Sequence, residues 1–298
     1  MLPARINSIL SIFQNNSFMP IETLFFNFTQ RLEYFSYSKT TNYMPRFSIN
    51  YLPFPGVQFS FIYGIFSQSP DDDILAYGRK ALPQSMSRHT IVSLSYNRSD
   101  LYFRVEPYYK KYMKLPLLDA GSYVSKGYGF SKGIDLFFDG SPLHNLRTTI
   151  AYSWNDSRRL YLDYSELSIP QYCTEHNFSI SGRYYIKRLN TYAGCSYTFA
   201  SGRPYHDPNL EGYMNAKTTP YGSLDINASI LTGPKVIVYA SVTNLTGKKN
   251  VFNYNYADIP DVNGHYAGIP VVASRDRFVY LGAFITISNA HAYEISNF

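Results

Sequence analysis

Arg104, Glu106 and Tyr108 lie at alternate positions and carry charged or hydrogen-bonding side chains that could contact a solute. Residues two apart in a β-strand point to the same side, so these side chains would line one face. Charged side chains lining a pore tune which solutes enter it, so this set is a candidate for solute contact. Four polar residues in other alternating runs complete the lumen-facing set: Asp135, Arg183, Asp225 and Asn227. The alternative is that these residues only pair with one another, with water or with another part of the protein.

A second set of candidates comes from two long polar segments. One is SGRPYHDPN at residues 201–209, and the other is the Asn- and Tyr-rich segment 244–276. Aromatic rings with a polar tip, beside amides, suit a glycan or a polar chelate. The alternative is that these loops pack over the strand ends and bind nothing. The candidates for ligand contact are Arg203, Tyr205, His206, Tyr254 and Tyr256.

Several other chemistries lack the residues that they need. Cys173 and Cys195 are too few for a disulfide framework, and we predict two unpaired thiols. With no CxxC and six dispersed histidines, no zinc site is expected. The acidic run at 71–73 lacks the glycine and spaced oxygen ligands of a calcium loop. The GxSxG match GFSKG at 129–133 lies inside a predicted strand rather than at a strand-to-helix turn, and neither His89 nor His144 has a serine partner by motif. We therefore predict a protein without catalytic residues, metal or cofactor.

The composition favours a β-rich protein. Aromatic residues make up 17% of the 298 residues, with 30 Tyr and 21 Phe, and both favour pleated, half-buried surfaces. The net charge of +6 raises nucleic acid as a partner, but Lys and Arg are scattered singly, so we discount it. No run of about 20 apolar residues exists, so no membrane helix is predicted. A membrane barrel remains open, because its strands expose only every second residue to lipid.

Alternating runs recur along the chain and helical periodicity is almost absent. Many runs reach the length of a tilted membrane strand, which is about ten residues. The predicted strands lie at 5–14, 23–36, 45–52, 57–67, 88–97, 100–112, 127–138, 146–155, 177–186, 190–201, 221–231, 235–243 and 277–288.

The connections alternate between short and long. The short ones are rich in Gly, Pro, Asn and Asp, and they lie at 20–22, 52–56, 97–100, 139–145, 187–190 and 232–235. The long polar ones lie at 68–87, 113–126, 156–176, 202–220 and 244–276, and only 37–44 is of modest length. Outer-membrane barrels are built with short periplasmic turns and long extracellular loops.

The two faces of each run differ in the same way. In residues 221–231, Leu224, Ile226 and Ala228 alternate with Asp225 and Asn227. A charge on a lipid face costs about 2–4 kcal/mol near the midplane, so the polar face would line a wet interior and the apolar face would meet lipid. The alternative is a soluble antiparallel sandwich with one buried face. We predict an all-β fold: an antiparallel transmembrane β-barrel portion of about 12–13 strands.

Several phrases, taken in order, resemble the C-terminal half of the TonB-dependent receptor barrels of Gram-negative bacteria, most closely those of Bacteroidetes. Each phrase is weak alone, but their order and spacing are specific and they cover almost the whole chain. The phrases are LFFNFTQRLEYF (24–35), PRFSINYLP (45–53), YGIFSQSP (63–70), FRVEPYYKKYMKLP (103–116), GFSKGIDLFF (129–138), SGRPY (201–205), YGSLDINASI (221–230), SVTNLTGKKNVFNYNY (241–256) and RFVYLGAFITIS (277–288).

The resemblance implies an outer-membrane transporter for a scarce nutrient such as a siderophore, cobalamin, oligosaccharide or peptide. It also implies a 22-stranded barrel closed by a plug domain and driven by the TonB system. Residues 1–298 carry no plug and no TonB box, so we expect a partial barrel domain with a C-terminal tail at 289–298. Its expected partners are outer-membrane lipid, a small nutrient ligand, and an N-terminal plug and barrel portion through which TonB would act.

Counting the strands back from the run at 277–288 supports a partial barrel. If that run closes the barrel in the periplasm, the run at 5–14 descends from outside, whereas both ends of a complete barrel lie in the periplasm. About nine strands and the plug are then expected upstream. Two alternatives stay open at this point: a free-standing porin of about twelve strands, and a soluble β-protein that binds carbohydrate.

Overall fold

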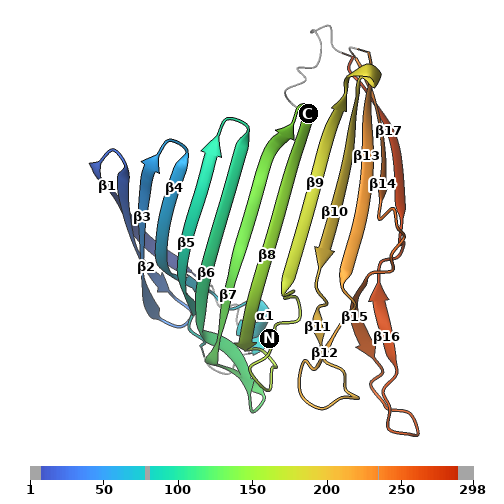
Figure 1. The fold of residues 1–298 in the computed structure, drawn as a ribbon. Helices are drawn as coiled ribbons and strands as arrows, with labels where there is room; N and C mark the ends of the chain where they lie inside the picture. Colours follow the sequence, from blue (N-terminus) through green and yellow to red (C-terminus); the bar gives the residue numbers. More distant parts are fainter. Residues whose placement is uncertain (1–7, 78–80, 234, 288–298) are drawn as a thin grey trace.

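A computed structural model describes residues 8–77, 81–233 and 235–287. Thirteen strands form one antiparallel sheet in which each strand pairs with the next strand of the sheet in chain order (Figure 1). This order confirms the predicted all-β barrel portion. The thirteen strands are β1 (Ile9–Ile21), β2 (Leu24–Phe35), β3 (Thr40–Phe54), β4 (Val57–Gln68), β5 (Ser85–Arg98), β6 (Leu101–Asp119), β7 (Ser122–Leu143), β8 (Leu146–Leu160), β9 (His176–Ile186), β10 (Thr191–Ala200), β13 (Tyr221–Gly233), β14 (Val236–Thr243) and β17 (Phe278–Ile285).

The register keeps one kind of side chain on each face of the sheet. In the middle of β10, β13 and β14, Ala193 pairs with Ala228, and Ala228 pairs with Ala240. One position along, on the opposite face, Asn227 pairs with Gly194 and Ser241. A slip by one residue would exchange these two rows, so the alternation fixes the register.

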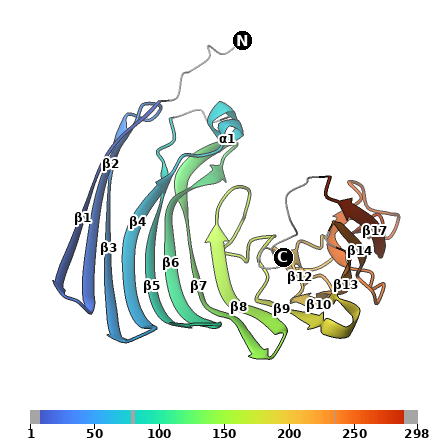
Figure 2. The ribbon, with the colours of Figure 1, turned by 90° about the horizontal axis from the view of Figure 1, so that it is seen from above.

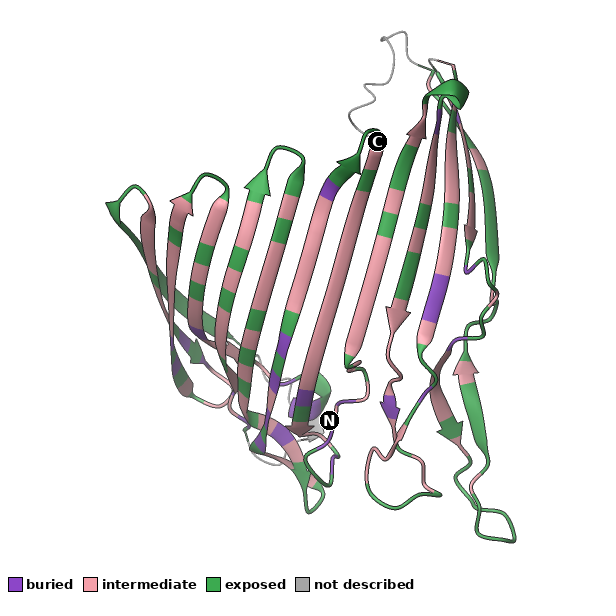
Figure 3. Ribbon diagram, viewed as in Figure 1, coloured by how far each residue is buried: buried purple, intermediate pink, exposed green. Residues whose placement is uncertain are grey.

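The sheet is curved into an open arc, with the helix α1 (Asp72–Tyr77) on its inner side (Figure 2). The outermost strands are β1 and β17, and they do not pair with each other. Most strand residues are half-buried or exposed, because a single sheet has no second layer to cover it (Figure 3). Most of the buried side chains lie where loops fold against the inner face.

Short turns lie at one end of the sheet and long loops at the other, as predicted (Figure 1). The expected long connection at 113–126 is wrong, because β6 and β7 continue through it as a protruding hairpin. Its turn is formed by Ala120 at φ 47° and Gly121 at φ 75°. Two left-handed residues in a two-residue turn suit a hairpin of twisted strands, and glycine adopts that conformation without strain.

The remaining long loops carry small elements of their own. Two short hairpins were expected as plain loop: β11 (Pro204–Tyr205) with β12 (Ala216–Lys217), and β15 (Val251–Tyr256) with β16 (Gly268–Val272). A 3-10 turn, η1 (Lys187–Leu189), closes the connection from β9 to β10. Among the described residues, no helix is long and apolar enough to cross a membrane.

The helix α1 (Asp72–Tyr77) lies in the loop between β4 and β5. Its first turn holds Asp72 and Asp73, whose charges suit the positive end of the helix. Ile74 and Leu75 pack with Phe35 and Leu82 in a buried cluster, against which Tyr37, Tyr123 and Leu162 are also packed. This apolar cluster fastens the loop to the outer ends of the strands.

Both ends of the predicted strand pattern differ from the structure or lie beyond it. The first strand runs to Ile21 rather than ending at residue 14, since Thr23 and Glu22 alone form its turn with β2. Residues 5–7 of the predicted run and the predicted tail at 289–298 lie outside the described residues.

Placing an arginine on the outward row tests which face meets lipid. Ala240→Arg should lower the free energy of unfolding by about 2–4 kcal/mol, because a charge would enter the apolar band. Ser241→Arg, one residue along on the opposite face, should cost much less. The measurement is chemical unfolding of the protein in lipid vesicles. Equal losses in the two variants would contradict the assignment of the faces.

Candidate functional site

The inner wall brings four of the predicted lumen-facing residues together. Arg104, Glu106 and Tyr108 lie at alternate positions of β6, and Glu106 pairs directly with Asp135 of β7. Two carboxylates opposite each other repel, so they need nearby donors. Arg104 Nε lies 3.9 Å from Glu106 Oε2, and Ser153 donates from Oγ to Asp135 Oδ1 over 2.6 Å. The result is a compact acidic patch held by one arginine and one serine.

Tyr108 covers a gap in this wall left by a glycine. Tyr108 and Gly133 are direct register partners. A Cβ built on Gly133 would lie 2.6 Å from the Tyr108 hydroxyl oxygen and would clash with the Trp154 carbonyl oxygen. The phenol ring therefore needs a glycine at this position in order to lie flat on the wall.

Arg104 lies between two shallow hollows of the inner wall. One has a volume of about 370 Å³, and the polar side chains that line it include Asp135, Ser153, Asn177, Ser179 and Thr198. The other has a volume of about 400 Å³, and its polar lining includes Gln58, Ser60, Ser93, Ser95 and Asn97. Hydroxyls and amides dominate the second hollow, whereas Leu136, Phe137 and Phe199 make the first hollow largely apolar between its polar groups.

The other three lumen-facing candidates lie on the same face but in different surroundings. Arg183 lies over the ring of Tyr192, with 5.2 Å between Cζ and the ring centroid. Asn227 lies beside Gly194, whose missing side chain makes room for the amide. Asp225 accepts hydrogen bonds from the Ser223 hydroxyl at 2.6 Å and from the Asn244 amide at 2.7 Å. Asp225 is thus committed to holding the start of the loop after β14.

The outer mouth gathers the loop candidates around stacked rings. The Tyr205 ring lies 4.9 Å from Tyr254 and 6.5 Å from Tyr256, between centroids. The guanidinium carbon of Arg203 lies 5.6 Å from the Phe252 ring centroid, outside the tyrosine stack. His206 stacks instead on Tyr213, at 5.3 Å between ring centroids. All five predicted loop residues therefore meet an aromatic ring, but they divide among three groups.

The row of rings extends beyond the residues chosen from sequence. Tyr164 lies 5.1 Å from Tyr213 and 4.8 Å from Tyr161, between ring centroids. Arg159 lies between Tyr161 and Tyr112, with Cζ at 5.7 Å and 4.3 Å from their centroids. The density of tyrosines in the two long segments 156–176 and 202–220 is the signal that could have found these residues. Their mutual contacts need the fold.

Hydrogen bonds between loops hold the rings in place. The Asn209 side chain donates to the Tyr266 carbonyl at 3.0 Å and accepts from the Tyr266 amide at 2.7 Å. Glu166 accepts from the Tyr213 amide at 3.2 Å, and Lys217 lies 3.3 Å from Glu175. The loops after β8, β10 and β14 are thereby joined into one outer mouth.

Three tyrosine hydroxyls of the outer mouth, those of Tyr205, Tyr213 and Tyr256, stay protonated at ordinary pH because the pKa of each is raised. Burial raises the pKa of Tyr205, and it raises the pKa of Tyr213 to about 12. Burial also raises the pKa of Tyr256, with the neighbouring Asp207 adding to the shift. For Asp207, burial acts to raise the pKa, but hydrogen bonds from Asn209 and Tyr256 outweigh it and lower the pKa. The site thus offers neutral hydroxyl donors beside one ionised carboxylate.

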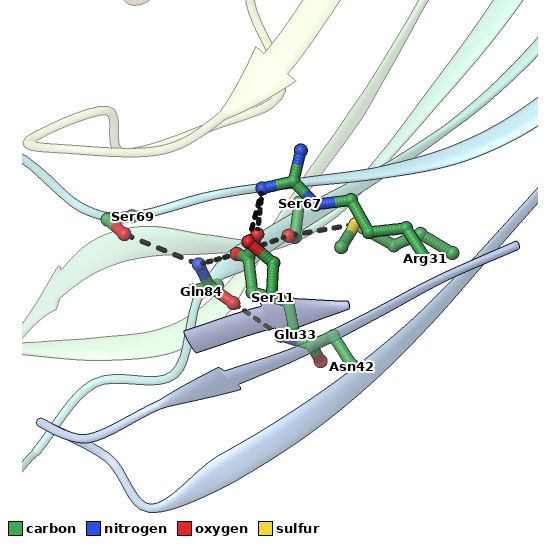
Figure 4. A network of polar contacts seen from close by, with 8 residues as sticks. Ser11, Arg31, Glu33, Asn42, Ser67, Ser69 and Gln84 are labelled. Carbon is green, nitrogen blue, oxygen red and sulfur yellow. Dashed lines mark hydrogen bonds and ion pairs between the residues drawn. The ribbon is translucent and has the colours of Figure 1, made fainter. Parts of the chain in front are cut away.

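A buried polar network fixes the other side of the mouth (Figure 4). Gln84 is 1% exposed, donates to Glu33 at 2.6 Å and accepts from Asn42 at 2.6 Å. Arg31 forms an ion pair with Glu33, and Ser69 accepts a longer hydrogen bond from Gln84 at 3.4 Å. The network joins strands β2 and β3 to the loop that carries α1, so it holds that loop on the inner side. Sequence reasoning missed Gln84 because nothing local marks it.

In the part of the chain that the structure describes, no three His, Cys, Asp or Glu side chains are grouped so that they could hold a metal ion. Cys173 and Cys195 are free thiols, as predicted.

The sequence and the fold identify the protein class. The family described as TonB dependent receptor-like, beta-barrel, matches residues 11–245, so the chain belongs to that family. Receptor barrels of this family lie in the outer membrane of Gram-negative bacteria, and the apolar face of this sheet therefore meets outer-membrane lipid. The finer resemblance to Bacteroidetes members stays a prediction. A comparison with curated protein sequences found no match.

Solved structures show the same fold. The ferric-catecholate import receptor Fiu from Escherichia coli K12 aligns with a TM-score of 0.73 and 12% identity, over 94% of this chain and 44% of that one. The FrpB iron transporter from Neisseria meningitidis aligns with a TM-score of 0.72 and 16% identity, over 94% and 44%. The ferric yersiniabactin uptake receptor FyuA from Yersinia pestis aligns with a TM-score of 0.73 and 10% identity, over 94% and 45%. The chain thus spans less than half the length of these structures.

Removing Gln84 tests the buried network. Gln84→Leu leaves the Asn42 side-chain amide without its acceptor and removes one hydrogen bond from Glu33, which keeps its ion pair with Arg31. The free energy of unfolding should therefore fall by about 1–3 kcal/mol. The loop at 69–84 should also be cleaved faster by an added protease. Gln68→Leu is the matched control, because that side chain is exposed. Unchanged cleavage and stability in Gln84→Leu would contradict the anchoring role.

Proposed function

We propose that the chain forms part of the wall and outer mouth of a transporter that imports a small, scarce nutrient across the outer membrane. The observation that carries this proposal is the pairing of a charged and polar patch on the inner face, around Arg104, Glu106 and Asp135, with a ring-lined mouth at its outer end. Solute would meet the outer mouth first and then pass the wall around Arg104 with its two hollows. The proposal assigns no catalytic step to any residue, and it needs no cofactor. Contact between the predicted site residues and a ligand remains part of the proposal.

The proposed transporter needs further strands beside this chain. The edges of β1 and β17 carry backbone groups without a neighbouring strand in the described sheet. Lipid cannot satisfy such groups, so a membrane sheet must close. We infer that an N-terminal portion supplies about nine strands, for a barrel of 22, and the plug through which the TonB system acts. The family membership favours this arrangement over the free-standing porin and over the soluble carbohydrate-binding protein.

The ligand class proposed first is an iron chelate. The similar structures are named as a ferric-catecholate receptor, an iron transporter and a ferric yersiniabactin receptor. The stacked rings and protonated hydroxyls of the outer mouth would receive the flat aromatic groups of a catecholate chelate. Cobalamin, a peptide and a neutral oligosaccharide are the other classes to compare, since the rings can stack on sugars too.

Removing one ring of the outer mouth tests the proposed site. Tyr205→Ala should weaken binding of a ferric catecholate chelate by about tenfold, because each aromatic contact contributes roughly 0.5–1.5 kcal/mol. The measurement is isothermal titration of the full chain in outer-membrane vesicles, with cobalamin, a peptide and a neutral oligosaccharide as parallel probes. Tyr172→Ala is the control, because that side chain is 80% exposed. Equal loss in both variants, or binding of none of the probes, would overturn the site.

Hydrogen exchange at the two edge strands tests the proposed partner. In outer membranes of the producing cells, backbone amides of β1 and β17 should exchange as slowly as those of β7. In the full chain purified and refolded alone, the edge amides should exchange at least tenfold faster, because nothing pairs with them. Equal protection of the edge amides in the chain refolded alone would show that the chain closes on itself as a smaller pore. That result would contradict the proposal that an N-terminal portion supplies further strands.

A further inference from the structure

Four cations lie on the outward face of the sheet, on neighbouring strands. Arg88 of β5 pairs directly with Lys111 of β6, and Lys111 pairs with Phe130 of β7. Phe130 in turn pairs with Arg158 of β8, and Lys132 lies two residues further along β7 on the same face. We name Arg88, Lys111, Lys132 and Arg158 the outer basic cluster. All four side chains are exposed.

The depth of the outer basic cluster follows from the register. On β6, the outward residues from Leu101 to Tyr109 are apolar or aromatic: Leu101, Phe103, Val105, Pro107 and Tyr109. Eight residues of strand rise about 27 Å, which a tilt of about 40° reduces to about 20 Å, close to the roughly 25 Å apolar band of a barrel. Tyr109 then lies at the outer aromatic girdle. Lys111, two residues further out, lies at the level of the lipid headgroups.

The charges of this cluster are not balanced by the protein. Asp156 is the carboxylate of the group, with Oδ2 at 3.3 Å from Lys132 and Oδ1 at 3.7 Å from Arg158. Among the described residues, Arg88 and Lys111 belong to no ion pair. They lie directly opposite each other, where like charges destabilise a sheet. Four cations and one carboxylate leave a net charge of +3 that an anionic partner would neutralise.

We propose that the outer basic cluster binds the phosphate groups of a phosphate-bearing lipid in the outer leaflet. Arg88 and Arg158 present planar guanidinium groups that hold phosphate through paired hydrogen bonds, and the lysines add point charges. The lipid's acyl chains would lie along the apolar rows below, from Tyr109 toward Leu101. Basic residues at the membrane surface attract anionic lipid in this way. This site is on the outside of the wall and takes no part in solute passage.

Neutralising three of the four cations tests the proposal. The full chain, purified from outer membranes in non-ionic detergent, is mixed with an acylated disaccharide bisphosphate, and bound lipid is counted by native mass spectrometry. Arg88→Gln/Lys111→Gln/Arg158→Gln brings the cluster to zero net charge while keeping the pair of Lys132 with Asp156. Lipid binding should fall at least tenfold. Arg98→Gln/Lys187→Gln/Arg188→Gln removes three exposed cations at the opposite, periplasmic end and should leave binding unchanged.

Two further probes separate the lipid from a free anion. The dephosphorylated form of the same glycolipid should bind at least tenfold more weakly, and inorganic phosphate at equal concentration should not displace the bound lipid. Equal lipid binding by the wild type and the triple variant would overturn the proposal, as would full displacement by inorganic phosphate. If the triple variant fails to insert, Lys111→Gln alone removes one of the two opposed charges and should weaken binding at least threefold. An unchanged single variant would then reject the site.

Discussion

The structure depends on the inability of lipid to hydrogen-bond with the protein backbone. Each strand must therefore find neighbours on both sides, which favours antiparallel pairing in chain order with tight turns. The same demand accounts for the partner proposed for the edges of β1 and β17. Because pairing takes up the backbone groups between neighbouring strands, the side chains on the two faces of the sheet are free to differ. One face carries apolar side chains for lipid, and the other carries hydroxyls, amides and charges for water.

The inner face balances its charges by contacts among near neighbours in the sheet. Glu106 and Asp135 are held by Arg104 and Ser153, and Tyr108 lies over a glycine. The outward face is apolar over the lipid band, but beyond that band Arg88 and Lys111 lie opposite each other without an ion-paired carboxylate among the described residues. Polar residues of the inner face are largely satisfied by one another, whereas the cations outside are left for lipid.

The sequence predicted the strands well because their signal has a period of two residues and is local. Strands such as β4, β9 and β14 lie within a residue or two of their predicted bounds. It failed where the membrane no longer constrains the chain, as in the hairpin that carries β6 and β7 beyond residue 113. The candidate residues of the outer mouth were chosen by type, but their division into three groups depends on contacts between separate loops. Gln84 lies 51 residues from Glu33, and no periodicity reports such a contact.

The two hydrogen bonds between Asn209 and Tyr266 join two loops that are far apart in sequence into one surface at the outer mouth. An antibody or other large molecule that settles there would recognise both stretches at once. A synthetic peptide copied from either stretch would lack the half that gives it shape. Immunisation with the folded chain, rather than with peptides, is therefore the route to reagents that detect it on intact cells.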